Sequence, residues 1–237
     1  MNQIRYSYNG HDEIRLYIPD SVFSPTDTTN ALIQAVESHV ERPGKLLDLG
    51  CGSGVTGIVL NKIGLVNDAL YASDVSVDAV KCAEENARFH NCQIVAKCGS
   101  LLEPWEGEEF DYIVDDISGV AEEVAKVSPW FHNVPCQSGP DGSILVTKVI
   151  TESPDYLNKG GALFFPVISL SNVNQILSVA RDTFSHVERL SRKEWPLPKD
   201  MYQHMPLLRK LQAESRIELD ERFGMVICYT EVFLARM

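Results

Sequence analysis

The chain has 237 residues, and its 33 acidic and 21 basic side chains give a formal charge of −12 at pH 7. Its composition, with 44% hydrophobic and 23% charged residues, is typical of a soluble globular protein. No apolar run approaches the roughly 18 residues of a membrane-spanning helix, which excludes an integral membrane protein of that kind.

Localisation and partners follow from the same features. The N-terminal residues contain no apolar stretch typical of a secretory signal, so we expect a cytoplasmic protein. The six cysteines form no C-x-x-C pair, and none stands at ligand spacing from a histidine, so we expect reduced thiols and no metal site. A net negative charge repels a phosphate backbone, so we expect neither nucleic acid nor a membrane as a partner.

The predicted elements alternate between helix and strand through the first two thirds of the chain, which is typical of a parallel sheet covered by helices. In chain order they are helix 27–40, strand 45–49, helix 54–63, strand 70–74, helix 77–90, strands 93–97 and 110–115, helix 143–157, strand 163–167, helix 173–184, and strands 186–195 and 224–235. The turn before strand 163–167 is assigned to Gly160 and Gly161. We expect one α/β domain over 1–237, with an N-terminal extension at 1–26 and a helical insertion at 196–223 that could cover a substrate as a lid.

A glycine loop follows the first predicted strand, where residues 46–54 read LLDLGCGSG. Glycines directly after a strand let the backbone turn tightly and approach a ligand. The pattern is G-x-G-x-G, and Asp48 precedes its first glycine by two positions, where it would repel a pyrophosphate. The loop therefore favours a ligand with a cationic amino-acid group over a nicotinamide dinucleotide.

A second acidic residue, Asp74, ends the next strand, 24 residues after Gly50. An acidic side chain at that distance meets the ribose hydroxyls of a nucleoside ligand in folds of this kind. Taken singly, Asp48 could cap a turn and Asp74 could cap helix 77–90. The combination of loop and carboxylate favours a ligand site.

Four segments, in this order and spacing, resemble the class I S-adenosylmethionine-dependent methyltransferases: LLDLGCGSG at 46–54, YASDVS at 71–76, GSLLEPW at 99–105 and FDYIVDD at 110–116. The resemblance implies a Rossmann-like α/β fold with a seven-stranded, mostly parallel sheet, an antiparallel last strand and helices on both faces. It also implies S-adenosylmethionine as cofactor. The cofactor-binding residues it implies are Asp48, Gly50, Cys51, Gly52, Gly54, Asp74, Val75, Ser100, Leu101 and Asp115.

The roles within that set also come from the resemblance. The glycine loop would wrap the methionine part of the cofactor, with Asp48 near its amino group, and Asp74 would take the ribose hydroxyls. Val75 would lie against the adenine. Ser100 and Leu101 stand where relatives carry an aspartate that accepts from the adenine amino group.

Three further segments resemble the small-domain branch of that superfamily, which includes the release-factor glutamine and rRNA guanine-N2 methyltransferases. They are VFSPTDTT at 22–29, GPDG at 139–142 and YLNKGG at 156–161. After the fourth strand those relatives carry Asn-Pro-Pro-Tyr, whereas this chain has Asp115 and Asp116 followed by Ile-Ser-Gly. A carboxylate offers only acceptors, so it suits an ammonium or hydroxyl group better than an amide and could act as a general base.

Acidic residues are concentrated around this motif. Between Leu101 and Ala125 there is no Lys or Arg, and the acidic residues are Glu103, Glu106, Glu108, Glu109, Asp111, Asp115, Asp116, Glu122 and Glu123. We expect them to line the mouth of the substrate site and to repel nucleic acid. The alternative is an ordinary solvated loop and helix start.

The sequence therefore predicts a methyltransferase acting on an N or O nucleophile of a small molecule, with Asp116 and His132 as catalytic residues and Trp130, Tyr202 and His204 as substrate contacts. Two alternatives remain open. One is a protein methyltransferase that modifies a side chain of a translation or ribosomal factor. The other is a protein that binds S-adenosylmethionine without catalysis.

Overall fold

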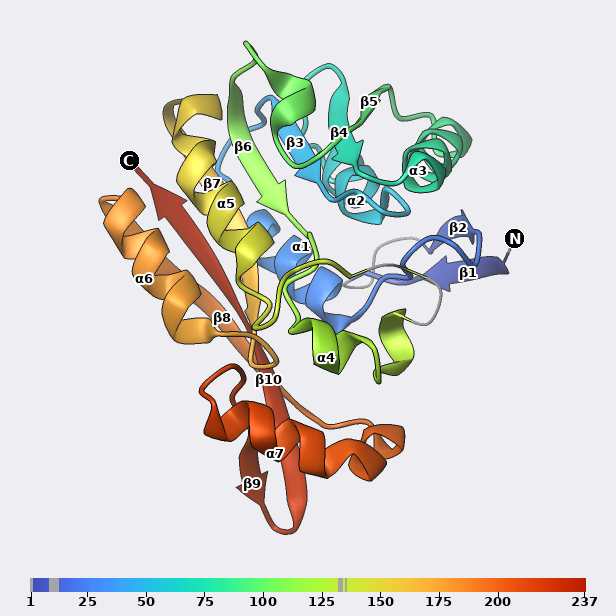
Figure 1. Ribbon diagram of the computed structural model, residues 1–237. Helices are drawn as coiled ribbons and strands as arrows, with labels where there is room; N and C mark the ends of the chain where they lie inside the picture. The colour runs from blue at the N-terminus through green and yellow to red at the C-terminus, as the bar shows by residue number, and fades with distance from the viewer. Residues whose placement is uncertain (1, 9–12, 132–133, 135) are drawn as a thin grey trace.

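The computed structural model describes residues 2–8, 13–131, 134 and 136–237 (Figure 1). Its main sheet has eight strands, in the order β5-β4-β3-β6-β7-β10-β8, with β9 paired to β10. The parallel strands are β3 (Leu46–Leu49), β4 (Leu70–Asp74), β5 (Ile94–Cys98), β6 (Phe110–Asp115) and β7 (Leu157–Ile168). Strand β10 (Met225–Arg236) runs antiparallel to both β7 and β8 (His186–Pro196). The predicted fold class, with its antiparallel last strand, is confirmed.

Helices cover both faces of the sheet (Figure 1). One face carries α1 (Asp27–His39), α2 (Val55–Lys62) and α3 (Val77–Phe89), and the other carries α5 (Ile144–Glu152) and α6 (Val173–Thr183). Successive side chains of a strand point to opposite faces, so Leu46 packs with the first group and Leu47 with the second. Within the described part of the chain, no helix is long and apolar enough to cross a membrane.

A hairpin that the sequence analysis missed precedes α1. Strands β1 (Asn2–Tyr6) and β2 (Ile14–Ile18) pair with each other and stand apart from the main sheet. The hairpin is held against α3, where the Asn86 side-chain oxygen accepts the Tyr17 N–H at 2.9 Å. It is held against α1 by the Tyr6 hydroxyl, which donates to Asn30. These contacts place the connecting segment 19–26 over the carboxyl ends of the parallel strands.

The segment 196–223 contains two short helical pieces and a strand in place of one inserted helix. They are the 3-10 helix η4 (Lys199–His204), α7 (Met205–Ala213) and β9 (Asp220–Arg222). Apolar side chains of η4 and α7 share a core with α4 (Glu122–Ala125). Arg216 joins the two, because it pairs with Glu123 at 2.8 Å and donates to the Pro140 carbonyl. Whether the segment moves as a lid stays a prediction.

Two boundaries near β7 differ from the prediction. The helix predicted at 143–157 ends at Glu152 and continues as the 3-10 helix η3 (Ser153–Tyr156), because Pro154 lacks the N–H that an α-helix would use. Strand β7 already begins at Leu157, so Gly160 and Gly161 lie inside it. Gly160 has φ +81°, and the register with β6 shifts between Phe110 and Tyr112, so the two glycines form an irregularity within the strand instead of a turn before it.

Candidate functional site

A cavity of about 550 Å³ opens at the carboxyl ends of β3, β4, β5 and β6. Ligands of open α/β sheets bind at this edge, and the volume is in the usual range for a small-molecule site. Its walls come from segment 21–29, the glycine loop, the ends of β4 and β5, and the residues that follow β6. The 3-10 helix η2 (Pro129–Phe131) contributes Phe131.

The three glycines of the loop meet different structural requirements. All have positive φ, at +75° for Gly50, +50° for Gly52 and +79° for Gly54. A Cβ on Gly50 would lie 2.7 Å from Ile117 Cγ2, and one on Gly54 would lie 3.0 Å from Ala83, so both allow close packing. At Gly52 the nearest atom to such a Cβ is 3.8 Å away, so this residue presents an open surface to the cavity.

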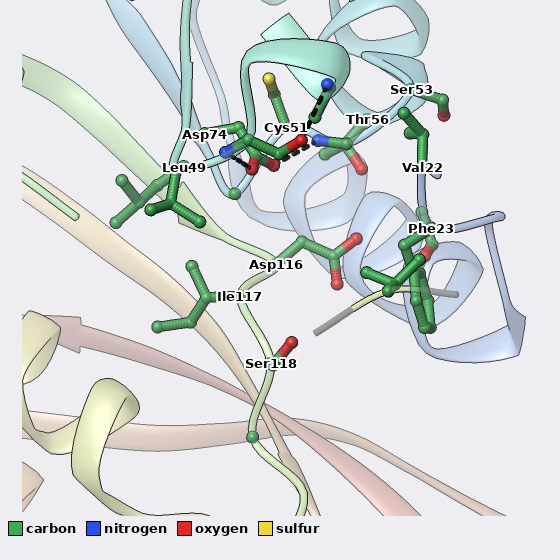
Figure 2. A pocket seen from close by; sticks show the side chains of 18 of the residues that line it. Val22, Phe23, Leu49, Cys51, Ser53, Thr56, Asp74, Asp116, Ile117 and Ser118 are labelled. Carbon is green, nitrogen blue, oxygen red and sulfur yellow. Dashed lines mark hydrogen bonds between the residues drawn. The ribbon is translucent and has the colours of Figure 1, made fainter. Parts of the chain in front are cut away.

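Asp74 joins the end of β4 to the glycine loop. Its Oδ2 accepts the Gly52 N–H at 3.0 Å, and its Oδ1 accepts the Ser76 N–H at 2.9 Å (Figure 2). Burial raises the pKa of Asp74, and these two N–H groups oppose the rise. Each carboxylate oxygen keeps a further lone pair for a hydroxyl group in the cavity.

The adenine side of the predicted cofactor site is formed by three residues. Val75 is 72% exposed beside Asp74. Ser100 and Leu101 follow β5 and line the same cavity, and Leu101 has φ +48°. A positive φ is unusual for leucine and turns the backbone sharply here. The structure thus brings these three residues to one side of the glycine loop.

Asp48 and Asp115 lie beneath the cavity and are fully buried. Asp48 Oδ2 accepts the Gly57 N–H at 2.9 Å, and Asp115 Oδ1 accepts the Ile117 N–H at 3.0 Å. The second oxygen of each has no hydrogen-bond partner among the described residues. Burial raises the pKa of both carboxyl groups to about 7, against the lowering effect of these N–H groups. The two residues therefore hold α2 and the start of the β6 loop in place from below.

Asp116 is the acidic side chain after β6 that reaches the cavity. Figure 2 shows its carboxylate between the glycine loop at Cys51 and the ring of Phe23. Burial raises the pKa of Asp116 to about 7, a hydrogen bond from Thr29 opposes the rise, and the charge of Asp115 adds to it. A carboxyl group with this pKa can accept and release a proton near neutral pH.

The remaining predicted site residues are spread over the molecule. Cys51 lines the cavity from the glycine loop although its side chain is largely buried, and burial raises the pKa of its thiol. Trp130 lines a second, neighbouring cavity. Tyr202 and His204 are absent from the described lining of both cavities, and the Tyr202 hydroxyl accepts the Val226 N–H at 3.0 Å. His132 lies outside the described residues. The roles of these residues stay predictions.

The expected acidic mouth is wrong. Of the nine acidic residues between Leu101 and Ala125, Asp116 is the one among the described lining residues of the cavity. Several are paired elsewhere: Glu108 with Lys45, the residue before β3, Glu103 with Lys148 on α5, and Glu123 with Arg216. The chain turns back after β5, so residues 103–111 lead to the amino end of β6, away from the site. The number of acidic residues along the sequence does not indicate at which edge of the sheet they lie.

Phe23, Thr29 and Phe131 line the cavity without having been singled out as site residues. Phe23 and Phe131 form a ring pair with centroids 5.1 Å apart. Thr29 lies in the first turn of α1, where its hydroxyl also accepts the Thr26 N–H at 3.3 Å. Two of them, Phe23 and Thr29, lie in the segment VFSPTDTT, whose resemblance to the segment before the first helix of relatives could have indicated them.

The strand order, the glycine loop after β3 and the carboxylate ending β4 together define the class I S-adenosylmethionine-dependent methyltransferase fold. Residues 13–116 match the family model described as "Methyltransferase small domain", so this segment of the chain is similar to that family.

Three curated relatives are similar to this chain. A release factor glutamine methyltransferase of Geobacter sulfurreducens is 27% identical, covering 62% of this chain and 53% of its own. A ribosomal protein L11 methyltransferase of Staphylococcus saprophyticus is 27% identical, and the match covers 71% of this chain and 54% of the relative. A ribosomal RNA small subunit methyltransferase C of Alcanivorax borkumensis is 30% identical, and the match covers 66% of this chain and 42% of the relative. The chain therefore spans about half the length of these relatives.

Solved structures share the fold. A T. Thermophilus 16S rRNA N2 G1207 methyltransferase, in complex with AdoMet and guanosine, superposes with a TM-score of 0.63 at 13% identity, covering all of this chain and 50% of the other. A ribosomal protein L11 methylase of Lactobacillus delbrueckii subsp. bulgaricus gives a TM-score of 0.54 at 18% identity, covering 89% and 80%.

Proposed function

We propose that the protein is an S-adenosylmethionine-dependent methyltransferase that modifies a side chain of a protein of the translation apparatus. The observation that carries this proposal is the single cavity in which the open face of Gly52, the Asp74 carboxylate and the Asp116 carboxylate meet. Two of the three curated relatives named above act on proteins by name, a release factor and ribosomal protein L11. This favours the protein substrate over the small molecule that the sequence analysis placed first.

The residues present fit the cofactor. The space beside Gly52, which a Cβ would fill, suits the close approach of a methionine chain to the backbone. Asp74 supplies acceptors for two vicinal hydroxyls, and Val75 supplies an exposed apolar surface for a planar base. The second oxygen of Asp48, buried without a partner among the described residues, lies beneath the loop and would favour a cationic amino group above it.

When bound, S-adenosylmethionine supplies an electrophilic methyl group on a sulfonium, and S-adenosylhomocysteine is left after the C–S bond breaks. The chain's own part is to bind, orient and exclude water. Asp116 would orient the attacking group and take its proton, while Phe23 and Phe131 close one side of the cavity against solvent. Holding the reactants in line supplies much of the acceleration expected for such a transfer.

A methyl-transfer assay with separate acceptors tests the proposal. The purified protein is incubated with radiolabelled S-adenosylmethionine and, in parallel, ribosomal proteins, release factors, ribosomal RNA and a small-metabolite fraction. We expect label in a protein band and in neither RNA nor metabolites. Label in RNA or a metabolite would overturn the choice of substrate, and cofactor binding without any transfer would favour a binding protein without catalysis.

A matched pair of variants shows whether transfer depends on the cavity. Asp74→Ala should lose transfer at low cofactor concentration, because the hydroxyl acceptors are removed. Asp155→Ala changes an exposed aspartate in η3, away from the cavity, and should leave transfer unchanged. Equal loss in both variants would mean that transfer does not depend on this cavity.

A further inference from the structure

The part of the chain that follows Asp116 forms one wall of the cavity and contains little regular structure. We call residues 117–131 and 136–143 the post-β6 wall. Several of them line the cavity, and among the described residues the wall contains only the short helices α4 and η2. Its two ends are joined, because the Gly139 carbonyl accepts the Glu122 N–H at 3.1 Å and Glu122 Oε1 accepts the Gly139 N–H at 3.0 Å. A wall without long helices or strands depends on the elements packed behind it for its position.

Segment 196–223 packs against this wall. In Figure 1, α4 lies between the end of β6 and α7. The two parts share one apolar core, whose fully or almost fully buried side chains include Val124 and Ala125 of α4, Met201 of η4, and Leu208 and Leu211 of α7. Removing this core from contact would expose apolar surface to water, which is unfavourable. The wall and the segment therefore form one packed unit.

Arg216 joins the segment to both ends of the wall. Its Nη1 pairs with Glu123 of α4 at 2.8 Å, and its Nε donates to the Pro140 carbonyl at 3.0 Å. Its Nη2 donates to the same carbonyl, and Glu214 of the segment pairs with Nη1 at 3.2 Å. A guanidinium presents its N–H groups in a rigid plane, so it holds several acceptors in one geometry, which the flexible ammonium of lysine does not.

Backbone hydrogen bonds tie the same segment to the main sheet. The Leu197 N–H donates to the Val226 carbonyl at 2.9 Å, and the Glu218 N–H donates to the Ser169 carbonyl at 2.6 Å. The Tyr229 hydroxyl donates to the Glu218 side chain. A lid that opened over the cavity would have to break these contacts as well as the ion pair of Arg216.

We propose that segment 196–223 is a fixed support of the cavity and does not open as a lid, and that Arg216 is the positioning residue through which it holds the post-β6 wall beside Asp116. The inference goes beyond the proposed function, because it concerns the wall and holds whichever group accepts the methyl. Arg216 is absent from the described lining of both cavities, so it acts through the wall alone. Because the wall continues directly from Asp116, a shift of α4 or of the turn at Pro140 would change the space in front of that carboxylate.

Hydrogen exchange of two amides tests whether the segment is fixed. The Leu197 and Glu218 N–H groups form its backbone bonds to the main sheet, so a segment that opens would expose both. We expect them to exchange at most about tenfold faster than the slowest amides of β10, both in the free chain and in its complex with S-adenosylhomocysteine. A larger ratio in the free chain would overturn the fixed support. If that ratio then fell in the complex, the segment would be a lid that closes on the ligand.

Fluorine NMR of the chain labelled with fluorotryptophan tests the role of Arg216. The chain has three tryptophans. Trp130 lies in the wall and packs edge-on against Trp195 of β8, with ring centroids 5.7 Å apart, whereas Trp105 is fully buried in another core and donates to Ser73. We expect Arg216→Met to shift or broaden the Trp130 signal, because both ends of the wall lose their partner. The Trp105 signal should stay unchanged as the internal reference.

Arg209→Met is the matched control for this variant. Arg209 is an exposed arginine of α7, and its described partners Gln212 and Glu221 lie within the segment. Its loss should leave the Trp130 signal unchanged. An unchanged Trp130 signal in Arg216→Met, or an equal change in Arg209→Met, would overturn the role of Arg216.

Changes at Glu123 keep the test decisive if Arg216→Met does not fold. Glu123→Ala removes the partner of Arg216 on the wall and should change the Trp130 signal, whereas Glu123→Gln keeps an acceptor and should restore the signal of the unmodified chain. A loss of stability alone would not separate these two variants in this way. Equal signals in both would overturn the contact as the device that positions the wall.

Ligand binding and kinetics separate this inference from the proposed function. Each variant should bind S-adenosylhomocysteine as the unmodified chain does, because the glycine loop and Asp74 are unchanged. With an acceptor from the transfer assay, Arg216→Met should raise the KM for the acceptor and leave the KM for S-adenosylmethionine unchanged. The reverse pattern would overturn the positioning role. Failure of the unmodified chain to bind S-adenosylhomocysteine would contradict the proposed function, and the exchange and fluorine results on the free chain would still decide the fixed support.

Discussion

Asp115 and Asp116 are adjacent in sequence, but their side chains lie in different surroundings. Asp115 is fully buried beneath the cavity and accepts one backbone N–H, whereas Asp116 lines the cavity beside Thr29. Burial raises the pKa of each to about 7, so both carry their protons over much of the acidic range. The two residues should therefore affect different measurements: Asp115 should affect stability and Asp116 should affect turnover.

The free energy of unfolding should depend on pH through Asp115. Its folded pKa lies above the ordinary value, so between about pH 4 and 7 the folded state binds more protons than the unfolded state and stability falls as pH rises. The slope is about 1.4 kcal/mol per pH unit for one such group, and it disappears above the folded pKa. Urea unfolding at pH 5, 6 and 7 should show a shallower fall for Asp115→Asn. An identical slope in both proteins would contradict the burial effect.

Turnover should rise with pH through about 7, because Asp116 must be ionised to accept a proton. In Asp116→Asn the rate should fall by about 10²–10⁴-fold, the range for loss of a positioned base, and its pH dependence near 7 should disappear. Cofactor affinity should hold, because the glycine loop and Asp74 are unchanged. If Asp116 only orients a cation, KM rises while the maximal rate holds. An active variant with unchanged KM would mean that Asp116 has a structural role.

At the scale of elements, the glycines of the loop divide into two that are required for packing and one that faces the ligand. Gly50 and Gly54 leave no room for a Cβ, whereas Gly52 faces open space in the cavity. All three have positive φ, which costs roughly 1–2 kcal/mol for a residue with a side chain. The loop therefore requires glycine at its middle position for the ligand and for the backbone, but not for packing.

Gly52→Ala should weaken binding of S-adenosylhomocysteine by about tenfold or more while lowering stability by roughly 1–2 kcal/mol. Gly64→Ala is the matched control. Gly64 also has positive φ, at +82°, and a Cβ there would meet nothing within 4 Å. Its stability loss should be similar and its ligand affinity unchanged. Calorimetry and urea unfolding of both variants check this, and equal affinities would mean that the open face of Gly52 is not a ligand surface.

The element pattern was predictable where periodicity was strong. All seven predicted strands are present, although β7 begins six residues before its predicted start. The central parallel strands were the clearest, because buried parallel strands are nearly continuous apolar runs. The β1–β2 hairpin and the short strand β9 were missed. Strand β9 has three exposed residues, so no apolar alternation marks it. The hairpin depends on distant partners such as Asn86, which a local pattern does not reveal.

The candidate site was predictable to a similar degree. The glycine loop and Asp74 lie together at the cavity because the carboxyl ends of adjacent parallel strands meet at one edge. Residues 103–111 were misplaced because the chain reverses after β5. The walls formed by Phe23 and Phe131 required the tertiary positions of segments more than a hundred residues apart.

At the scale of the whole molecule, charge limits the partners. The net charge is −12, and the described lining of both cavities contains no Lys or Arg. Phosphate contacts by basic side chains supply most of the affinity for nucleic acid. The basic residues of β8 are partly neutralised, since Arg189 and Arg192 both pair with the buried Glu231. The proposed protein substrate is consistent with this distribution.

RNA binding should accordingly be weak at physiological salt. Gel-shift titration with ribosomal RNA fragments should show only non-specific association above micromolar concentrations, weakening further as salt is raised. A sub-micromolar, sequence-specific complex would contradict the partner assignment. It would also favour the reaction named for the rRNA methyltransferase relative.

The most direct test of the central claim, that this cavity binds S-adenosylmethionine, is a calorimetric titration. The unmodified chain should bind S-adenosylmethionine with micromolar affinity, and Asp74→Ala should bind it about ten- to a hundredfold more weakly, from the loss of charge-assisted hydrogen bonds worth ~1.5–3 kcal/mol. NAD should give no heat of binding, because the buried Asp48 carboxylate beneath the glycine loop would repel a pyrophosphate above it. Tight NAD binding without S-adenosylmethionine binding would contradict the account.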